Sequence, residues 1–452
     1  MTRSKSIRFF CASLAMLFVL VIGLAGCGSQ ASPAPGTTAE ASGSTAAPAD
    51  TKDAEPVTLT FASMSTVQQG VFDKLDLIGS YKKIKPNVTI EIEKFKDSTE
   101  FDNALKIRKT ANELPDVFNV KPYALSIYKD DLLPLDDLEA AKNNLYGQNF
   151  AIDGKIMGLP SSSFNEFVYY SKSIYKEYGL SVPKTWSQFV ENTRTIQKGG
   201  KYIPILLGQK DDWVNYPWTE LMAPVIANDG FLCNTIATQD EPFTKGQPFY
   251  TGLERFKQLV DIKAFGPDPL GAGYAQVKTM LLTKQGAQLA AGAWMLPDVL
   301  DQAKQSNLDL NDIGTFFMPA RENESEPFRI LTYVDDFTVI PKNNKNVEES
   351  KAFMEWYFGK DWYPTYMKEM GLISTVKDIK VEMNPVLQQA YDNQPDAQPL
   401  VYDGGNTDYQ KLQSATQFSV KKMGQDLVAG KDLDKMMADM NKYWKDARAN
   451  MK

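Results

Sequence analysis

Two tryptophans and a tyrosine lie within six residues of one another in the stretch QKDDWVNYPWTE, at Trp213, Tyr216 and Trp218. The same stretch carries Asp212 and Asn215. Aromatic rings can stack on the apolar C–H faces of a sugar, and carboxylates and amides can form paired hydrogen bonds with its hydroxyls. We therefore predict that Asp212, Trp213, Asn215 and Trp218 contact a carbohydrate. The alternative is that these rings pack in a core, because tryptophan is usually buried.

Further polar and aromatic residues lie where predicted strands end. The stretch VTLTFAS is followed by more polar chain, and DVFNV runs into a lysine. Binding clefts of α/β folds form at strand ends, where the loops project. VYDGGNTDY, near the C-terminus, is expected to cap such a cleft. The residues predicted to contact ligand on these grounds are Ser63, Met64, Ser65, Asn119, Lys121, Asp335, Asp336, Tyr402 and Tyr409.

The chain has no histidine. This excludes Ser-His-Asp and Cys-His nucleophile pairs and histidine-ligated zinc. A glycosidase needs only two carboxylates that flank the scissile bond. Neighbouring residues of a strand point to opposite faces, so the doublet Asp335-Asp336 is not expected to serve as that pair. Other carboxylates could still meet in space. We predict a protein that is not an enzyme and has no cofactor or metal, with a secreted glycan hydrolase or adhesin as the less favoured alternative.

The elements that must position these residues alternate between strand and helix patterns. Residues 185–199 begin with Thr185 and Gln188 in the spacing of a capping box, and residues 433–447 carry an apolar stripe. Alternating strands and helices indicate an α/β fold. Residues 57–452 are too many for one ordinary domain. The predicted strands are 57–63, 88–95, 116–120, 167–171, 203–208, 288–294 and 335–341.

The N-terminus has the layout of a secretory signal, with a basic start at Arg3, Lys5 and Arg8 and an uncharged apolar run over 9–25. It ends in Leu-Ala-Gly-Cys, which resembles the bacterial lipobox. We predict that residues 1–26 are a signal peptide and that Cys27 is lipidated, because a thiolate is the nucleophile that would take the lipid. The alternatives are a retained anchor helix or a simple signal beside a chance cysteine.

Removal of residues 1–26 would take away three of the 49 basic residues and no acidic one, so 46 basic and 56 acidic residues remain, with a net charge of −10. Such a surface is a poor partner for nucleic acid. Residues 28–56 are rich in Ala, Ser, Thr, Gly and Pro, which indicates a disordered tether. Cys233 is then the one remaining thiol, and it is expected to be a buried apolar residue.

Several stretches resemble, in the same order, the extracellular solute-binding proteins of bacterial ABC importers, of the maltose- and oligosaccharide-binding type. They run over most of residues 57–375. The similarity is weaker after about residue 380. The stretches are ANELPDVFNV with LLPLDDL, DGKIMGLPSSSFNEFVYYSKSIYKEYGLSVPKTWSQF, GAQLAAGAW and VIPKNNKNVEESKAFMEWYF.

The resemblance implies a two-lobed periplasmic-binding-protein type II fold with a ligand cleft between the lobes. Lobe 1 would be 57–163 with 333–373, and lobe 2 would be 164–332 with 374–452, after a signal over 1–26 and a tether over 27–56. Hinge crossings would fall near 161–165, 331–333 and 372–375. Trp294 would be the stacking tryptophan of a Gly-x-Trp pair, and Glu166 would be a polar ligand contact at the first hinge.

The predicted function is capture of a carbohydrate, with an oligosaccharide favoured, and its delivery to an ABC permease by hinge closure. The lipid would hold the protein at the outer face of the cytoplasmic membrane. An alternative within the same fold is a non-sugar solute such as a peptide or polyamine. Rings paired with neutral amides favour sugar, whereas a pocket with several carboxylates and few amides would favour a polyamine.

Overall fold

A computed structural model of the chain describes residues 55–451. Its strands follow the apolar runs of the sequence, and the alternation in VTIEIE buries Val88 and Ile90 while Thr89 and Glu91 face outward. The strands are β1 (Val57–Ala62), β2 (Val88–Glu93), β3 (Val117–Val120), β4 (Leu159–Ser171), β5 (Ile203–Ile205), β6 (Gly286–Gly292), β7 (Ile313–Phe316), β8 (Phe328–Val339) and β9 (Ala397–Tyr402).

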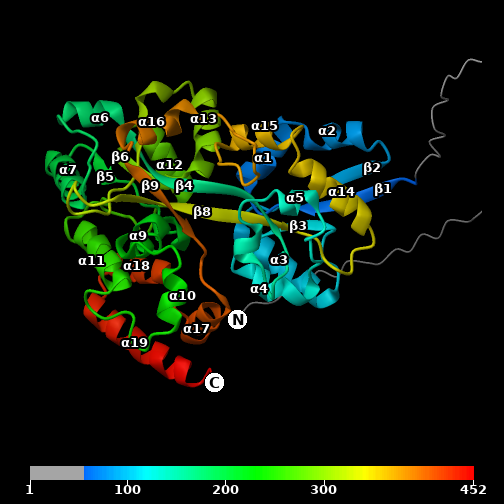
Figure 1. The fold of residues 1–452 in the computed structure, drawn as a ribbon. Coiled ribbons are helices and arrows are strands. Elements are labelled where there is room, and N and C mark those ends of the chain that lie inside the picture. The colour runs from blue at the N-terminus through cyan, green and yellow to red at the C-terminus, as the bar shows by residue number, and fades with distance from the viewer. Residues whose placement is uncertain (1–54, 452) are drawn as a thin grey trace, which may run out of the picture. The chain divides into compact units, whose positions relative to one another are not determined.

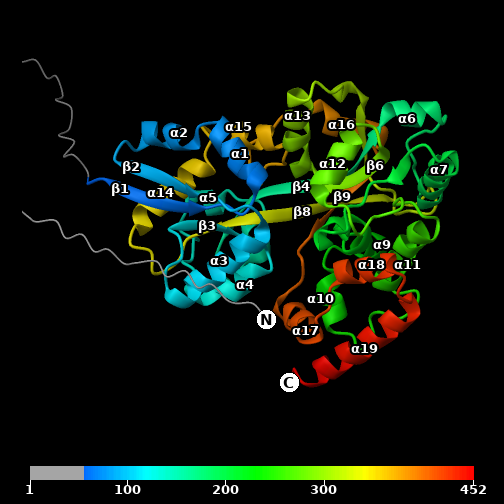
Figure 2. The same ribbon diagram turned by 180° about the vertical axis from the view of Figure 1, so that it is seen from behind.

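These strands form one mixed sheet of nine, in the order β2-β1-β3-β8-β4-β6-β5, with β7 on β4 and β9 on β8. The long strands β4 and β8 pair antiparallel over 159–165 and 332–338. Beyond Asn165, β4 changes partner and pairs with β6 and β7. Both ribbon views show β4 and β8 side by side through the middle of the sheet (Figures 1 and 2). Two strands therefore connect the first part of the sheet to the second.

The first part of the sheet, β1 to β3, is covered by short helices from two distant stretches of sequence. Asp97 caps one of them by accepting a hydrogen bond from the Glu100 amide, and left-handed Asn112 ends the same helix. The helices are α1 (Thr66–Lys74), α2 (Leu77–Ile84), α3 (Ser98–Ala111), α4 (Ala124–Tyr128), α5 (Glu139–Lys142), α14 (Val347–Tyr357) and α15 (Tyr363–Met370), with the 3-10 turns η1 (Lys129–Asp131) and η2 (Gly147–Phe150).

The second part of the sheet is covered by the remaining helices. They are α6 (Lys172–Glu177), α7 (Trp186–Gly199), α8 (Tyr216–Thr219), α9 (Met222–Ala227), α10 (Leu232–Ala237), α11 (Pro248–Asp261), α12 (Tyr274–Leu282), α13 (Leu296–Gln305), α16 (Pro385–Asn393), α17 (Thr407–Thr416), α18 (Val420–Val428) and α19 (Leu433–Ala449). The 3-10 turns here are η3 (Asp212–Asn215), η4 (Ala293–Met295) and η5 (Leu310–Asp312).

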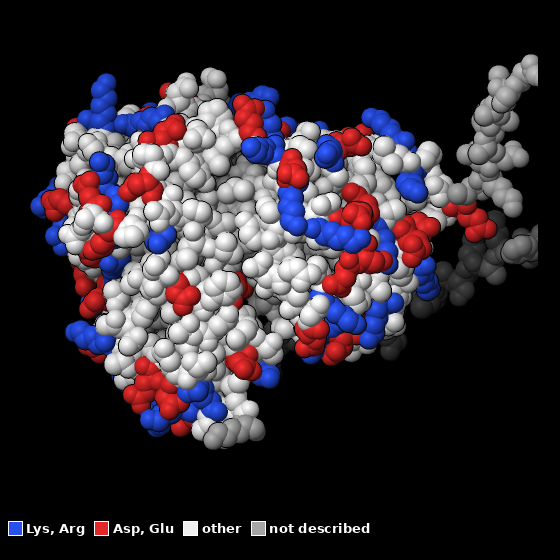
Figure 3. Space-filling view, viewed as in Figure 1, with Lys and Arg blue, Asp and Glu red and all other residues white. Residues whose placement is uncertain are grey.

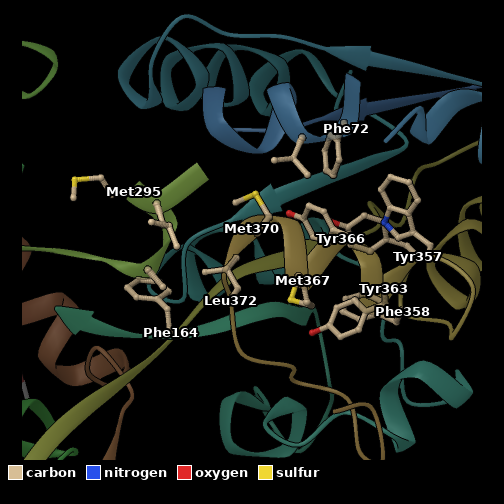
Figure 4. Packing of buried hydrophobic residues seen from close by; sticks show 14 of the residues in the cluster. Phe72, Phe164, Met295, Tyr357, Phe358, Tyr363, Tyr366, Met367, Met370 and Leu372 are labelled. Carbon is tan, nitrogen blue, oxygen red and sulfur yellow. The ribbon is translucent and has the colours of Figure 1, made fainter. Parts of the chain in front are cut away.

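The core under the first part of the sheet is aromatic. Phe72 of α1 lies 5.3 Å from the ring of Tyr366 and 6.2 Å from that of Tyr357. Figure 4 shows these rings together, with Phe164 and Leu372 beside the crossing strands. Packed aromatic pairs of this kind add to the free energy gained by burying their area. Helix α1 is thereby packed against α14 and α15, which lie some 270 residues later in the sequence.

The segments predicted as hinge crossings lie next to one another. Phe164 is opposite Tyr333 in the β4–β8 register, and Ser163 forms a bridge with Ile373. The ring centroids of Phe164 and Tyr333 are 5.3 Å apart. The division into two lobes at these segments stays a prediction.

Every predicted strand overlaps an observed one, although most of the predicted strands extend one to three residues too far, and the sequence interpretation missed four segments. These are the first halves of β4 and β8, together with β7 and β9. Serines and a proline interrupt the apolar pattern of 159–166, so β-propensity is weak where the crossing occurs. At α7 the Thr185 cap is confirmed, but the Gln188 side chain accepts from the Lys184 amide, one residue before the capping-box position.

The predicted stripe of the last helix is narrower in the structure. Leu433, Met437 and Trp444 are buried, whereas Tyr443 is 53% exposed. Cys233 is buried as predicted. In Figure 3, charged side chains lie over α5 and α14 on the right, along the left edge near α6 and α7, and at the bottom near α19, whereas the middle of that face is mostly uncharged.

Candidate functional site

A cavity of about 250 Å³ lies between the loop after β3 and the C-terminal part of the chain. Pro122 and Tyr123 form one wall, and Tyr333 of β8 and Tyr402 of β9 form another. The strands β3 and β9 end here, whereas β8 continues to Val339, so the loops after β3 and β9 contribute to the lining. The remaining lining residues are Glu220, Gly404, Tyr409, Gln410, Gln413, Ser419, Val420 and Lys421.

The charges of this cavity neutralise each other. Lys421 Nζ lies 3.1 Å from one oxygen of Glu220, and the Tyr402 hydroxyl donates to the other oxygen at 3.1 Å. The negative charge of Glu220 raises the pKa of Lys421, although burial acts in the opposite direction. The rest of the lining offers rings, amides and hydroxyls. The arrangement suits a neutral, polyhydroxylated ligand better than a strongly charged one.

Four rings outside the lining of this cavity form what we call the aromatic group: Trp213 of η3, Tyr216 of α8, Tyr274 of α12 and Trp294 of η4. Trp213 lies 5.0 Å from Tyr274 and 5.7 Å from Trp294, measured between ring centroids. Trp294 Nε1 donates to the Tyr216 hydroxyl at 3.3 Å. All four side chains are half-buried. They form a partly exposed aromatic surface of the kind that stacks on a sugar ring.

Glu166 lies behind the aromatic group, on β4 opposite Gly292 of β6. Its Oε1 accepts a hydrogen bond from the Tyr216 hydroxyl. Burial and, more weakly, the nearby charge of Glu220 raise the pKa of Glu166 to about 8, although the Tyr216 hydrogen bond acts to lower it. A carboxyl with this pKa is largely protonated at neutral pH.

Lys121, at the end of β3, holds two carboxylates of β8. Its Nζ lies 2.6 Å from Asp335 and 3.5 Å from Asp336. Burial raises the pKa of Asp336 to about 6; Lys121 opposes this shift and Asp335 adds to it. The two carboxylates raise the pKa of Lys121, although burial alone would lower it. The three residues form a compensated ion cluster.

The expectation that Asp335 and Asp336 face opposite sides of a strand is wrong. Asp336 has a left-handed backbone with φ of 52°, and the Ser161 hydroxyl donates to its carbonyl. This local departure from extended geometry breaks the alternation, so both carboxylates reach Lys121. Asp335 and Asp336 both pair with the Lys121 ammonium group, so they do not support the glycosidase alternative.

The residues at the end of β1 mostly bond within the protein. The Ser63 hydroxyl donates to Gln68, and the Ser65 side chain caps α1. Met64 is buried. Asn119 Nδ2 donates to Thr338 Oγ1 at 3.3 Å, while its Oδ1 has no partner among residues 55–451. None of these residues is among the lining of the 250 Å³ cavity, and a direct ligand contact for them stays a prediction.

The stretch around Trp213 divides between surface and interior. Trp218 is 1% exposed and packs 5.6 Å from Phe189. Asn215 is buried and donates to the Lys421 carbonyl at 2.8 Å. Asp212 is exposed. Trp218 of α8 and Asn215 of η3 thus have their side chains buried inside the protein, and a ligand contact for them stays a prediction.

Tyr402 and Tyr409 were predicted to cap a ligand cleft. Both line the cavity, but little of either side chain is exposed. The predicted set omitted Tyr123, Glu220, Tyr274 and Lys421. Tyr123 follows the strand end at Lys121 by two residues, so the strand-end rule could have included it. No local pattern marks Tyr274 or Lys421, which come from distant helices.

Within residues 55–451, no group of three acidic, histidine or cysteine side chains could hold a metal ion. None of the helices in that range is long and apolar enough to cross a membrane. Cys27 and the predicted signal and tether lie outside the described residues.

The sequence profile described as bacterial extracellular solute-binding protein matches residues 60–364. The Multiple sugar-binding protein of Streptococcus mutans serotype c is 22% identical over 323 residues, which are 69% of this chain and 74% of the relative. The match is therefore spread over most of both chains.

Solved structures show the same fold. RafE in complex with raffinose has a TM-score of 0.71 at 19% identity and covers 86% of this chain and 99% of its own. BlMnBP1 from Bifidobacterium animalis subsp. lactis, in complex with mannobiose, has a TM-score of 0.73 at 19% identity and covers 88% and 96%. These likenesses confirm the predicted α/β periplasmic-binding fold.

Proposed function

Because this chain belongs to the bacterial extracellular solute-binding proteins, we propose that it captures an oligosaccharide and delivers it to an ABC importer. Membership of a solute-binding family agrees with the prediction that it is not an enzyme. The observation that carries the proposal is the 250 Å³ cavity, which is lined by rings, amides and hydroxyls. It is linked to the aromatic group through Glu220 of its lining, whose backbone amide donates to the Tyr216 carbonyl at 3.0 Å. Relatives named for multiple sugars and for raffinose support the choice of carbohydrate.

The state of the charges favours a sugar over a polyamine. Glu220 is paired with Lys421, and Asp335 and Asp336 are paired with Lys121. A polyamine would need carboxylates that are free to receive ammonium groups, because an unpaired buried charge is costly. A neutral ligand can instead use the existing donors and acceptors without separating these ion pairs.

Capture would use the two crossing strands as a hinge. Ligand binding favours closure only when the ligand contacts are better in the closed form than in the open one. Tyr123 from the first part of the sheet and Tyr333 from the crossing strand line the same cavity, so a ligand between them would connect the two sides. The closed form would then dock on the permease.

We also propose that lipidation at Cys27 holds the protein at the outer face of the cytoplasmic membrane. The small residues before the thiol and the polar stretch after it support this processing. Cys27→Ser should abolish incorporation of a labelled fatty acid in cells and release the protein into the medium. Cys233→Ser is the matched control, because that thiol is buried. Unchanged labelling of the Cys27 variant would contradict the anchor.

The function is tested by a thermal-shift screen of residues 53–452, which form a compact unit by themselves. The solutes are monosaccharides, raffinose- and mannose-type oligosaccharides, peptides and polyamines. A ligand at about a hundred times its dissociation constant adds roughly 2.7 kcal/mol of stability. Stabilisation by an oligosaccharide supports the proposal. Stabilisation by peptides or polyamines alone would overturn the sugar assignment while leaving the family unchanged.

The cavity itself is tested by two tyrosine variants. Tyr123 is 42% exposed at the cavity, and Tyr443 is 53% exposed on α19. Tyr123→Ala should weaken binding of the best ligand about tenfold in calorimetry, through loss of one stacking ring. Tyr443→Ala removes a similar exposed ring and should leave the affinity unchanged. Equal affinities for both variants would mean that the ligand binds elsewhere.

A further inference from the structure

Three side chains form a hydrogen-bonded relay from the aromatic group to the crossing strand. Trp294 Nε1 donates to the Tyr216 hydroxyl at 3.3 Å, and that hydroxyl donates to Glu166 Oε1. The Tyr216 oxygen therefore accepts from an indole and donates to a carboxyl group at the same time. A phenol has one proton to donate, so the two bonds depend on each other.

Glu166 occupies the residue at which β4 changes partner. Asn165 is the last residue of β4 paired with β8, opposite Thr332, and Glu166 is the first paired with β6, opposite Gly292. Gly292 lies two residues before Trp294, so strand pairing and the relay join the same two segments. The Glu166 carboxyl group is therefore hydrogen-bonded to the aromatic group at the residue where β4 changes partner from β8 to β6.

The two carboxyl oxygens of Glu166 differ in their surroundings, because only Oε1 accepts a hydrogen bond from Tyr216. Oε2 is buried and has no hydrogen-bond partner among residues 55–451. Glu166 also lines a small cavity of about 40 Å³, whose other walls are largely apolar, including Phe167, Pro217 and Leu221. An ionised carboxylate is poorly stabilised in such surroundings, which makes its protonation state sensitive to its few neighbours.

We propose that Glu166 is a positioning residue whose protonation state sets the orientation of Tyr216 and Trp294, and thereby the affinity for ligand. The proposal rests on the proposed function, because it assumes that Trp294 faces the ligand. It assigns Glu166 a role behind the aromatic surface, where the sequence had suggested a direct ligand contact.

The direction of the effect follows from hydrogen-bond chemistry. An ionised carboxylate only accepts, so Tyr216 must donate to it and keeps its oxygen lone pairs for the Trp294 indole. A protonated carboxyl can donate to the Tyr216 oxygen and compete with that indole. Ionisation therefore fixes Trp294, and affinity should rise as Glu166 loses its proton.

The groups around Glu166 set the pH at which its carboxyl group loses its proton. Burial and the charge of Glu220 raise the pKa of Glu166 to about 8, while the Tyr216 hydrogen bond lowers it. Arg329 is a charged residue that also lines the small cavity, and its Nη1 donates a hydrogen bond to Gln398 Oε1. Burial raises the pKa values of the neighbouring phenols well above their usual range, so these stay protonated near pH 8; they are Tyr169, Tyr216, Tyr274 and Tyr333.

The relay is tested first without ligand, by fluorine NMR of the protein labelled with 5-fluorotryptophan. Trp294→Phe identifies the Trp294 resonance. That resonance should shift with pH around a midpoint near 8 in the wild type and stay constant in Glu166→Gln and Tyr216→Phe. Glu191→Gln removes an exposed carboxylate of α7 and should leave the titration intact. A flat wild-type resonance, or one that still titrates in Glu166→Gln, overturns the proposal.

The consequence for binding is tested by calorimetry with the best solute of the screen, at about pH 6.5 and about pH 9.5, on either side of the Glu166 pKa. Wild-type affinity should rise about fivefold or more, and Glu166→Gln should show no such rise. Equal pH dependence in both proteins overturns the proposal. The NMR experiment needs no ligand, so failure of the relay and failure of the sugar assignment are distinguishable.

Discussion

Two groups of aromatic residues lie in the second part of the molecule, and they contain the same residue types but differ in how far their rings are exposed. The core group consists of Trp186, Phe189, Trp218 and Phe316, all buried, with Phe189 5.6 Å from each of the two tryptophans. The rings of the aromatic group are half-buried, with a hydrogen bond from Trp294 to Tyr216 and another from Tyr216 to Glu166. Trp213 and Trp218, five residues apart, belong to different groups.

The difference shows that partners and exposure, and not residue type, distinguish a packing ring from a binding ring. Rings of the core group are surrounded by apolar side chains, with Trp186 Nε1 donating to Gln258 at 2.8 Å. Rings of the aromatic group keep part of their surface exposed. Buried area contributes to folding, whereas exposed aromatic area remains available to a ligand. The two groups should therefore respond differently to the same substitution.

The largest expected effect is on folding, from Trp218→Ala. Removing a fully buried tryptophan leaves a cavity, and the free energy of unfolding should fall by about 3–5 kcal/mol. The measurement is urea denaturation followed by circular dichroism. Trp213→Ala, from the same short stretch, should cost much less because its ring is half-buried. Equal losses would remove the distinction between the two groups.

A smaller effect, on binding, is expected from Trp294→Ala. Loss of a partly exposed ring should reduce ligand affinity about tenfold, an effect of about 1.4 kcal/mol. The melting temperature should change little. Trp356→Ala, a half-buried tryptophan of α14, is the control and should leave affinity unchanged. If Trp294→Ala instead lowers the melting temperature strongly and leaves the ligand affinity of the folded protein unchanged, Trp294 belongs with the core group.

An effect of a different kind, spread over several pH units, is the pH dependence of stability that Glu166 contributes. Its folded-state pKa is raised from 4.5 to about 8. The folded state therefore binds the proton more tightly, so this contribution is complete below the unfolded pKa and is lost as pH rises towards 8. The slope is at most about 1.4 kcal/mol per pH unit for one proton.

Glu166→Gln should remove this slope. The wild type should lose stability relative to the variant between about pH 6 and about pH 7.5, by less than about 1.4 kcal/mol per pH unit, in denaturation curves at each pH. Glu191→Gln is the exposed control and should follow the wild type. Parallel curves for wild type and Glu166→Gln would show that the carboxyl is not perturbed by its burial.

Most strands and the long helices were predictable because they depend on short-range patterns. Alternation in VTIEIE and the Thr185 cap were interpreted correctly from neighbouring residues. The crossing segments were harder. The serines of 161–163 have weak strand propensity, and they are extended because β8 pairs with them over several residues.

The candidate site was predictable only in part. Lys121, Trp213, Trp294 and Glu166 were identified by strand ends, composition or family resemblance. Lys121 lies in the ion cluster, the two tryptophans lie in the aromatic group, and Glu166 is hydrogen-bonded to Tyr216 of that group. Tyr274 was not, because it enters the aromatic group from α12, some sixty residues from Trp213 in sequence. The error at Asp335 and Asp336 arose from one left-handed residue, which alternation cannot reveal.

The sequence by itself determined the family, the α/β class and the absence of histidine chemistry, because these depend on composition and on the order of short motifs. The tertiary structure decided which ring of WVNYPW is buried, which carboxylates share Lys121 and which tyrosine meets Glu166. These outcomes depend on residues brought together from distant segments. The environment of a side chain, and with it its pKa and its access to ligand, is set by those long-range neighbours.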